Sequence, residues 1–192
     1  MNAFGVTTVN WTVLLDTKST EWNQPKRQLD YGTYFVDFRA AFASNPYMIG
    51  SAGGFIKIVE SPLRAEILGG RKVTRGKGNN ITLNGSLSRD PDTKQGDISS
   101  MEFTWLCKTR QELFPVSLSV ANLPSVPGKG GCFGTGVKKL SSNQSVVVLT
   151  TSAMSVGEFY DVKLIVQKGV RQDEVVQEIE IVSGNPPEIT IE

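Results

Sequence analysis

The chain has 192 residues, of which 39% are hydrophobic and 8% aromatic, enough to bury a core in one large or two small domains. Lys and Arg number 20 against 19 for Asp and Glu, a balance that argues against nucleic acid or an anionic membrane as an electrostatic partner. Histidine is absent, which excludes Ser-His-Asp and Cys-His catalysis and most zinc sites.

Apolar residues form no run of about 18, the length that a membrane-spanning helix needs. The N-terminus also lacks the basic start and apolar stretch of a signal peptide. We therefore expect any signal and any membrane anchor to lie outside this sequence, and we expect this fragment to make no membrane contact.

Alternation of apolar and polar residues with a period of two dominates the chain and predicts β-strands. In chain order, these strands lie at residues 9–15, 34–40, 55–59, 63–67, 81–83, 103–105, 146–149, 160–166 and 175–181. Turn-forming clusters separate them, including Asn45-Pro46, Gly53-Gly54, Asp90-Pro91-Asp92 and Pro127-Gly128. The basic stretch at residues 71–77 is interspersed with glycine, and we expect a solvated connection there. The pattern predicts an all-β class built from β-sandwich modules.

A weak internal repeat divides the chain. The strand at residues 34–38 matches that at residues 160–164 as Tyr-x-Val-x-apolar, and each precedes a second strand and a proline-containing junction, Ser61-Pro62 or Asn185-Pro186-Pro187. We expect three parts: residues 1–61 as the C-terminal strands of a preceding β-sandwich, residues 62–184 as one module, and residues 185–192 as the start of the next. About 60 residues cannot close a seven-stranded sandwich, so the first part should depend on its neighbour or on missing sequence.

Tyr160 stands near the start of the penultimate predicted strand. It is either the phenol of a tyrosine corner, bonded to backbone, or an ordinary core residue. An antibody-type sandwich has a cysteine two residues later, where this sequence has Val162, so the inter-sheet disulfide of antibody domains is absent.

Cys107 and Cys132 are the only cysteines and flank a loop rich in Pro and Gly. A single pair in a sandwich of extracellular character predicts a disulfide, which would stabilise the fold by roughly 3.5 kcal/mol. The alternative is two buried thiols in a cytosolic protein. Two cysteines without histidine do not complete a zinc site. Trp105 shares the strand face of Cys107, so we expect its indole beside the bridge.

Four Asn-x-Ser/Thr sequons predict N-glycosylation at Asn10, Asn80, Asn84 and Asn143. If residues 81 and 83 face the core, Asn80 and Asn84 face solvent, as a glycan requires. Asn10 likewise alternates with apolar neighbours.

The stretch at residues 84–92, Asn-Gly-Ser-Leu-Ser-Arg-Asp-Pro-Asp, is a strand that runs into a tight turn. We expect Asp90 and Asp92 to bind nearby backbone N–H groups. The alternative is a calcium site, for which two carboxylates are too few without further oxygens. No acid/base pair, nucleophile elbow or phosphate loop is visible, so we expect no catalytic residue, no metal and no cofactor.

Together these stretches resemble the REJ (receptor for egg jelly) region of the polycystin-1 family. Residues 61–70 are similar to its opening segment, residues 83–92 follow at the family's spacing, and Phe103-Thr104-Trp105-Leu106-Cys107 is similar to its aromatic-x-Trp-x-Cys strand. The segment around Cys132, Gly-Cys-Phe-Gly, resembles the second cysteine of the family's local bridge, and residues 29–38 resemble the end of a PKD-type repeat. The resemblance therefore implies immunoglobulin- or fibronectin-like (PKD-like) β-sandwich modules in tandem, with residues 1–61 as the C-terminal strands of a preceding PKD-like sandwich and residues 62–184 as the REJ-type module. The family usually has Asp in place of Asn84, which weakens a calcium role.

The resemblance implies a non-catalytic module in the glycosylated ectodomain of a multi-pass receptor at the plasma or ciliary membrane. Relatives act in adhesion, in ligand or mechanical sensing, and in association with polycystin-2-type cation channels. The implied partners are adjacent domains of the same ectodomain, a polycystin-2-type channel subunit through the full-length protein, and glycan or protein ligands. The alternative is a free-standing carbohydrate-binding or adhesin module, whose aromatic platform would use Trp22 and Tyr47.

Overall fold

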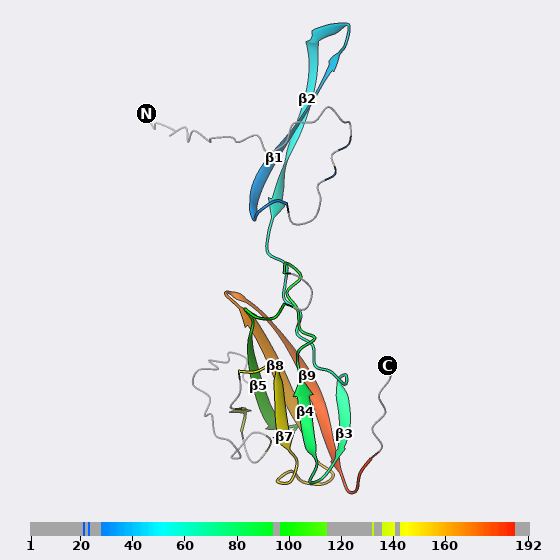
Figure 1. The fold of residues 1–192 in the computed structure, drawn as a ribbon, viewed down its shortest axis with the longest axis vertical. Coiled ribbons are helices and arrows are strands. Elements are labelled where there is room, and N and C mark those ends of the chain that lie inside the picture. Colours follow the sequence, from blue (N-terminus) through cyan, green and yellow to red (C-terminus); the bar gives the residue numbers. More distant parts are fainter. Residues whose placement is uncertain are drawn as a thin grey trace, which may run out of the picture. The chain divides into compact units, whose positions relative to one another are not determined.

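The computed structural model describes residues 21, 23, 28–93, 97–114, 132, 136–140 and 143–186. Within these residues it contains nine β-strands and no α-helix, so the predicted all-β class is confirmed. The predicted strand at residues 9–15 and the turn at Pro127-Gly128 lie outside the described residues. Among the described residues there is no helix with the length and hydrophobicity of a membrane span. The chain divides into two compact units, Met1–Val59 and Glu60–Glu192 (Figure 1).

The first unit contains one antiparallel hairpin, formed by β1 (Gly32–Phe42) and β2 (Asn45–Ile58). The expectation that Asn45-Pro46 and Gly53-Gly54 form turns is wrong, because both lie inside β2. Proline is tolerated near the start of an edge strand, where it need not donate to a ladder. Gly53 has a packing role, since a Cβ there would lie 2.5 Å from the Phe35 ring.

The two faces of this hairpin differ in polarity. Cross-strand partners share a face, so Tyr34, Val36 and Phe38 lie on the same side as Ile56, Gly54 and Ala52. The opposite face carries charged residues and one aromatic contact, between Phe35 and Phe55, with ring centroids 5.0 Å apart. A two-stranded hairpin alone is marginally stable in water, so its apolar face requires a cover.

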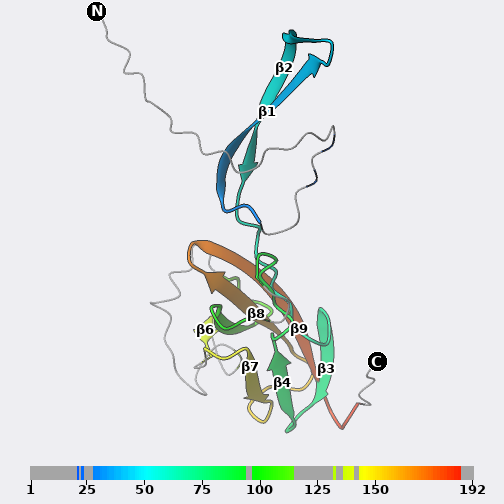
Figure 2. The ribbon, with the colours of Figure 1, turned by 45° about the horizontal axis from the view of Figure 1, so that its top comes forward.

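The second unit is a β-sandwich of two sheets. The larger sheet has the strand order β3-β9-β8-β5-β6, and the smaller pairs β4 with β7. The strands are β3 (Lys72–Gly76), β4 (Asn80–Asn84), β5 (Glu102–Thr109), β6 (Lys138–Lys139), β7 (Val146–Thr150), β8 (Phe159–Lys168) and β9 (Arg171–Val182). Figure 2 shows β4 and β7 as a layer over the larger sheet. All pairings are antiparallel except that of β3 with β9, which is parallel.

The core lies between these two sheets. Trp105 and Leu164 of the larger sheet are fully buried in one cluster with Ile81 and Leu83 of the smaller sheet. The inward register predicted for residues 81 and 83 is therefore confirmed. Burial of each such side chain contributes about 1.5–3 kcal/mol to folding.

Two other expectations are wrong. The basic stretch at residues 71–77 is not a solvated connection but contains β3, whose Lys72 Nζ lies 3.1 Å from Glu180 and 3.4 Å from Glu178 of β9. The predicted strand at residues 63–67 forms only an isolated bridge between Arg64 and Arg89. The next two backbone N–H groups, of Ala65 and Glu66, donate to the side chains of Asp173 and Ser88 and not to a neighbouring strand.

Candidate functional site

A disulfide joins Cys107 of β5 to Cys132, with Cα atoms 5.2 Å apart and a sequence separation of 25. Both cysteines are buried beside Trp105, as expected from their shared strand face. The indole N–H of Trp105 donates a hydrogen bond of 2.9 Å to the carbonyl oxygen of Gln144. The bridge and the indole thus connect β5 to two later segments of the chain, which is a structural role.

The sequon asparagines fall in different places. Asn10 lies outside the described residues, whereas Asn80 and Asn84 begin and end β4 and Asn143 precedes β7. Asn80 and Asn143 are exposed and Asn84 is half-buried. The Oδ1 atom of Asn84 accepts a hydrogen bond of 2.9 Å from the Ser86 N–H. Three of the four sequons therefore lie on or next to the smaller sheet.

Asp90 forms the expected turn, because its Oδ1 accepts the Asp92 N–H at 3.0 Å. It is also buried, at 3% exposure, and both its oxygens bind cations. Lys168 Nζ lies 2.7 Å from Oδ2, and Arg171 binds both carboxylate oxygens at 2.9 Å in a bidentate pair.

The charges around Asp90 explain its protonation behaviour. Burial raises its pKa, but hydrogen bonds from Arg171 and Lys168 outweigh burial and hold the pKa well below its usual range. The hydrogen bond to Asp90 in turn raises the pKa of Arg171. Among the described residues, no group of three or more acidic, cysteine or histidine side chains is placed to hold a metal ion. The Asp92 N–H, Lys168 and Arg171 together engage both carboxylate oxygens of Asp90, which is the geometry that the turn interpretation expects.

The same network holds the incoming junction, which we define as Glu60 and Ser61. The Ser61 N–H and hydroxyl donate to the Asp92 carboxylate at 2.7 and 2.6 Å. Arg171 Nη1 donates to the Ser61 carbonyl oxygen at 2.8 Å, and its Nε makes a 3.1 Å ionic contact with Glu60. The chain just before Pro62 is thereby tied to the start of β9.

The outgoing junction, defined as residues 184–186, lies against the turn between β3 and β4. Asn79 Nδ2 donates to Asn185 Oδ1 at 2.8 Å. A Cβ at Gly76 would lie 2.0 Å from the Gly184 carbonyl oxygen, so only glycine allows this close approach of backbones. Pro187, part of the predicted junction, lies outside the described residues.

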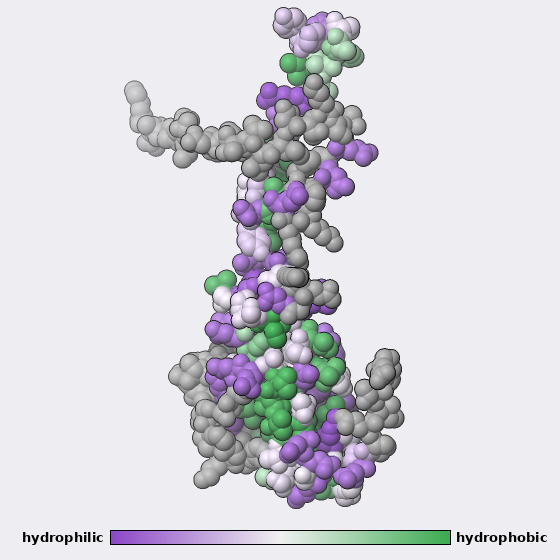
Figure 3. Space-filling view, viewed as in Figure 1, coloured by the Kyte–Doolittle hydropathy of each residue, from purple (hydrophilic) through white to green (hydrophobic). Residues whose placement is uncertain are grey.

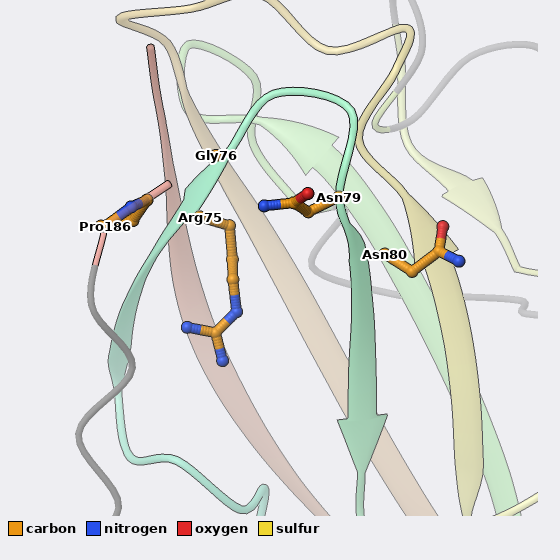
Figure 4. Close-up of a pocket in the computed structure, with 5 residues that line it drawn as sticks. All are labelled: Arg75, Gly76, Asn79, Asn80 and Pro186. Carbon is orange, nitrogen blue, oxygen red and sulfur yellow. The ribbon is translucent and has the colours of Figure 1, made fainter. Parts of the chain in front are cut away.

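A shallow polar hollow of about 330 Å³ lies beside the outgoing junction. It is lined by Arg75, Gly76, Asn79, Asn80 and Pro186. In Figure 4 the side chain of Asn79 points toward the side of Arg75 and Pro186, whereas that of Asn80 points away from them. The hollow offers hydrogen-bonding groups but no acid/base pair.

The two junctions lie at opposite ends of β9. This strand has 12 residues and, at about 3.3 Å per residue, spans roughly 36 Å. The segment after Ser61 follows β9 along that length: the Ala65 N–H binds Asp173, Gln177 binds the Leu68 carbonyl oxygen, and β3 pairs up to Val182. The incoming segment and the last strand are thus fastened side by side along the module.

Two aromatic residues singled out in the sequence have clear environments. Tyr160 is buried, and its hydroxyl accepts a 2.9 Å hydrogen bond from the Ser155 N–H, the arrangement of a tyrosine corner. Tyr47, at the start of β2, is 93% exposed. Its suggested companion, Trp22, lies outside the described residues.

Sequence reasoning missed Lys168 and Arg171. They flank the two-residue turn of the β8–β9 hairpin, where Gly169 has a φ of 58°. A glycine between two alternating segments signals this turn. Nothing in the sequence links it to Asp90, which lies 81 residues before Arg171 in the chain.

Comparisons with known proteins place the chain in a family. The family model for the REJ domain matches residues 3–192, which includes the hairpin assigned to a PKD-type repeat from the sequence. The "Polycystin family receptor for egg jelly" of Mus musculus is 32% identical over 96 residues, covering 47% of this chain and 4% of that protein. The Homo sapiens protein of the same name is 28% identical over 111 residues, covering 52% of this chain and 5% of that protein.

The chain therefore spans only a small part of the length of these relatives. Among solved structures, a nucleoside hydrolase-related hypothetical protein from Saccharophagus degradans, associated with carbohydrate metabolism, is 15% identical. It aligns with 66% of this chain and 26% of its own, at a TM-score of 0.40, which is too low to assign fold or function. The REJ match covers nearly the whole sequence, and this chain belongs to the REJ-domain family.

Proposed function

We propose that this chain is an extracellular, non-catalytic structural and interaction module of a polycystin-1-like multi-pass cell-surface receptor. The REJ match and the two relatives, both named as receptors, support this assignment. The whole receptor would act in adhesion and in ligand or mechanical sensing at the plasma or ciliary membrane, associated with a polycystin-2-type channel subunit. Within it, this module would hold adjacent domains of the ectodomain in a defined order and direction.

We also propose the module boundaries expected from the repeat: residues 1–61, 62–184 and 185–192. Two observations support them. The second compact unit begins at Glu60, and side chains of that unit hold both Ser61 and Asn185. A junction held in this way restricts the angle at which a neighbouring domain leaves the module, more than a free linker would.

The single observation that carries this role is the parallel pairing of β3 with β9 between junctions at opposite ends. Tension applied at Ser61 and Asn185 pulls these parallel strands past each other along their length. Such a load falls on all five residue pairs of the β3–β9 ladder together, not on one pair at a time. Each hydrogen bond contributes only about 0.5–1.5 kcal/mol, so sharing the load determines the resistance.

Single-molecule pulling in two geometries tests this role. With handles at residues 60 and 186, the unit should unfold at a several-fold higher force than with handles at residues 77 and 183, which lie at one end of the ladder and peel β3 from β9. Equal forces in the two geometries would contradict a load-bearing role. An antibody to this region should also label unpermeabilised cells that make the full-length protein; labelling only after permeabilisation would contradict the extracellular location.

A carbohydrate-binding or adhesin module remains the second candidate, favoured by the 93% exposure of Tyr47. Exposed aromatic rings stack on sugar faces. Binding on a glycan array that is lost in Tyr47→Ala would favour this candidate, and absence of any binding would favour the spacer role.

A further inference from the structure

The small sheet gathers three sequons around one surface. Asn84 pairs with Val146 and Asn80 with Thr150 in the β4–β7 register, and Asn143 lies three residues before Val146. Because side chains alternate along a strand, the inward Ile81 and Leu83 place Asn80, Thr82 and Asn84 on the outer face. Asn80 and Asn84, four residues apart, are separated by about 13 Å along β4.

An exposed valine lies between these two asparagines. Val148 pairs with Thr82, so it is the diagonal neighbour of both Asn80 and Asn84, at about 7–8 Å from each. It is 62% exposed, and Val146, opposite Asn84, is also exposed. Figure 3 shows a hydrophobic patch on the side of this unit where β4 and β7 lie in Figure 1.

β7 is also an edge strand. Among the described residues its only strand partner is β4, so the backbone groups on its other side face away from the sheet. Its sequence, Val-Val-Val-Leu-Thr, has high β-propensity and neither charge nor proline. Edge strands of this kind add strands from other chains unless something blocks them.

We propose that N-linked glycans on Asn80 and Asn84, together with one on Asn143, cover the outer face of β4 and β7 and block the free edge of β7. This rests on the proposed extracellular function, since the glycan donor is met in the secretory pathway. In the modification, the Asn Nδ2 forms a bond to the anomeric carbon of a lipid-diphosphate-linked oligosaccharide. The bond from that carbon to the diphosphate oxygen breaks, the lipid diphosphate leaves with the electron pair, and Nδ2 loses one proton to a base of the transferase.

The folded geometry accommodates such glycans. Asn80 is exposed at the end of the sheet, and in Figure 4 its amide points away from Arg75 and Pro186. At Asn84, the bond from the Ser86 N–H engages Oδ1 and leaves Nδ2 as the substituted atom. Asn79 is the matched internal control, because it is exposed beside Asn80 but heads no sequon, and its Nδ2 donates to Asn185.

The first measurement maps glycans on the 192-residue chain secreted from eukaryotic cells behind a leader peptide. Glycopeptide mass spectrometry should find glycans at Asn80 and Asn84 and none at Asn79. Thr82→Ala should remove the first and Ser86→Ala the second, although both variants keep the asparagine. Unmodified Asn80 and Asn84 in a secreted chain with an intact Cys107–Cys132 disulfide would overturn this proposal and leave the extracellular function standing. A retained chain with reduced cysteines would overturn both.

The second measurement tests the blocked edge. Sedimentation of the glycan-free triple variant Asn80→Gln, Asn84→Gln, Asn143→Gln should show self-association stronger by at least about tenfold than that of the glycosylated protein. Adding Val148→Lys should restore the monomer by placing a charge on the edge strand, whereas Val170→Lys, at a 97% exposed position in the β8–β9 turn, should not. A monomeric triple variant, or association that Val148→Lys leaves unchanged, would overturn the shielding role.

Discussion

The β1–β2 and β8–β9 hairpins share a sequence pattern but lie in different surroundings. Each begins with Tyr-x-Val-x-apolar, and each tyrosine hydroxyl binds backbone a few residues upstream: Tyr34 donates to the Asp30 carbonyl oxygen at 2.8 Å, and Tyr160 accepts from the Ser155 N–H at 2.9 Å. In β8–β9 a second sheet covers the apolar face, and Leu164 is fully buried. In β1–β2 the equivalent Phe38 is 50% exposed.

This contrast shows that local alternation and turn chemistry are enough to pattern a hairpin but not to stabilise it. The free energy comes from the layer that covers the apolar face, because the gain is proportional to the apolar area removed from water. The same substitution should therefore have different consequences in the two hairpins or the sheets next to them.

The largest difference is expected between Trp105→Ala and Phe38→Ala. The first removes a fully buried ring at the centre of the sandwich and should cost about 3–5 kcal/mol of the free energy of unfolding of the second unit. The second acts on a half-exposed ring and should cost about 1 kcal/mol or less of the stability of the whole chain. Urea unfolding of both variants measures this, and equal losses would mean that the hairpin face is covered as fully as the sandwich core.

A smaller contrast separates two ion pairs. Arg171→Met leaves Asp90 buried with one cation fewer and should cost about 3 kcal/mol. Arg39→Met removes the exposed Arg39–Asp37 pair of β1 and should change stability by about 0.5 kcal/mol or less. Thermal unfolding at pH 7 compares the two variants, and a similar shift in both would show that the Asp90 network is effectively solvated.

The Asp90 network also predicts a dependence on pH. The folded-state pKa of Asp90 lies below its unfolded value, so its contribution is fully present above the unfolded pKa of about 3.9 and is lost as the pH falls through the folded pKa. Stability of the second unit should therefore decline from about pH 5 to below about pH 2. The Asp90→Asn variant should decline less steeply over that range in a series of urea titrations. Parallel curves would assign the acid sensitivity to other carboxylates.

The smallest contrast concerns the two tyrosine hydroxyls. Tyr160→Phe removes the acceptor of the Ser155 N–H, in a hydrogen bond that is partly buried, and should cost about 1 kcal/mol. Tyr34→Phe removes an exposed hydrogen bond, whose loss water compensates, and should be close to neutral. Differential scanning calorimetry resolves effects of this size, and the reverse order would argue that only the first hairpin has a true tyrosine corner.

Much of the strand inventory could be predicted because its signals are local. Alternation around Ile81, Trp105 and Tyr160 reports which side chains leave water, and this is decided within a few residues of sequence. The same reasoning failed at residues 63–67, where the alternation of Leu63 and Ile67 does report burial. There the backbone N–H groups bind Asp173 and Ser88 side chains in place of a strand partner, which no pattern of hydrophobicity records.

The sequence by itself determined the all-β class, the inward faces of the sandwich strands, the single cysteine pair and the turn at residues 90–92, because each depends on residue types at short spacing. Tertiary structure decided the parallel pairing of β3 with β9, the clamp of Ser61 by Asp92 and Arg171, and the meeting of three sequons on or next to one sheet. These contacts join positions up to 110 residues apart, as for Ser61 and Arg171. The topology that buries the core determines which segments lie side by side. Charged side chains then pair with the partners that this arrangement places near them.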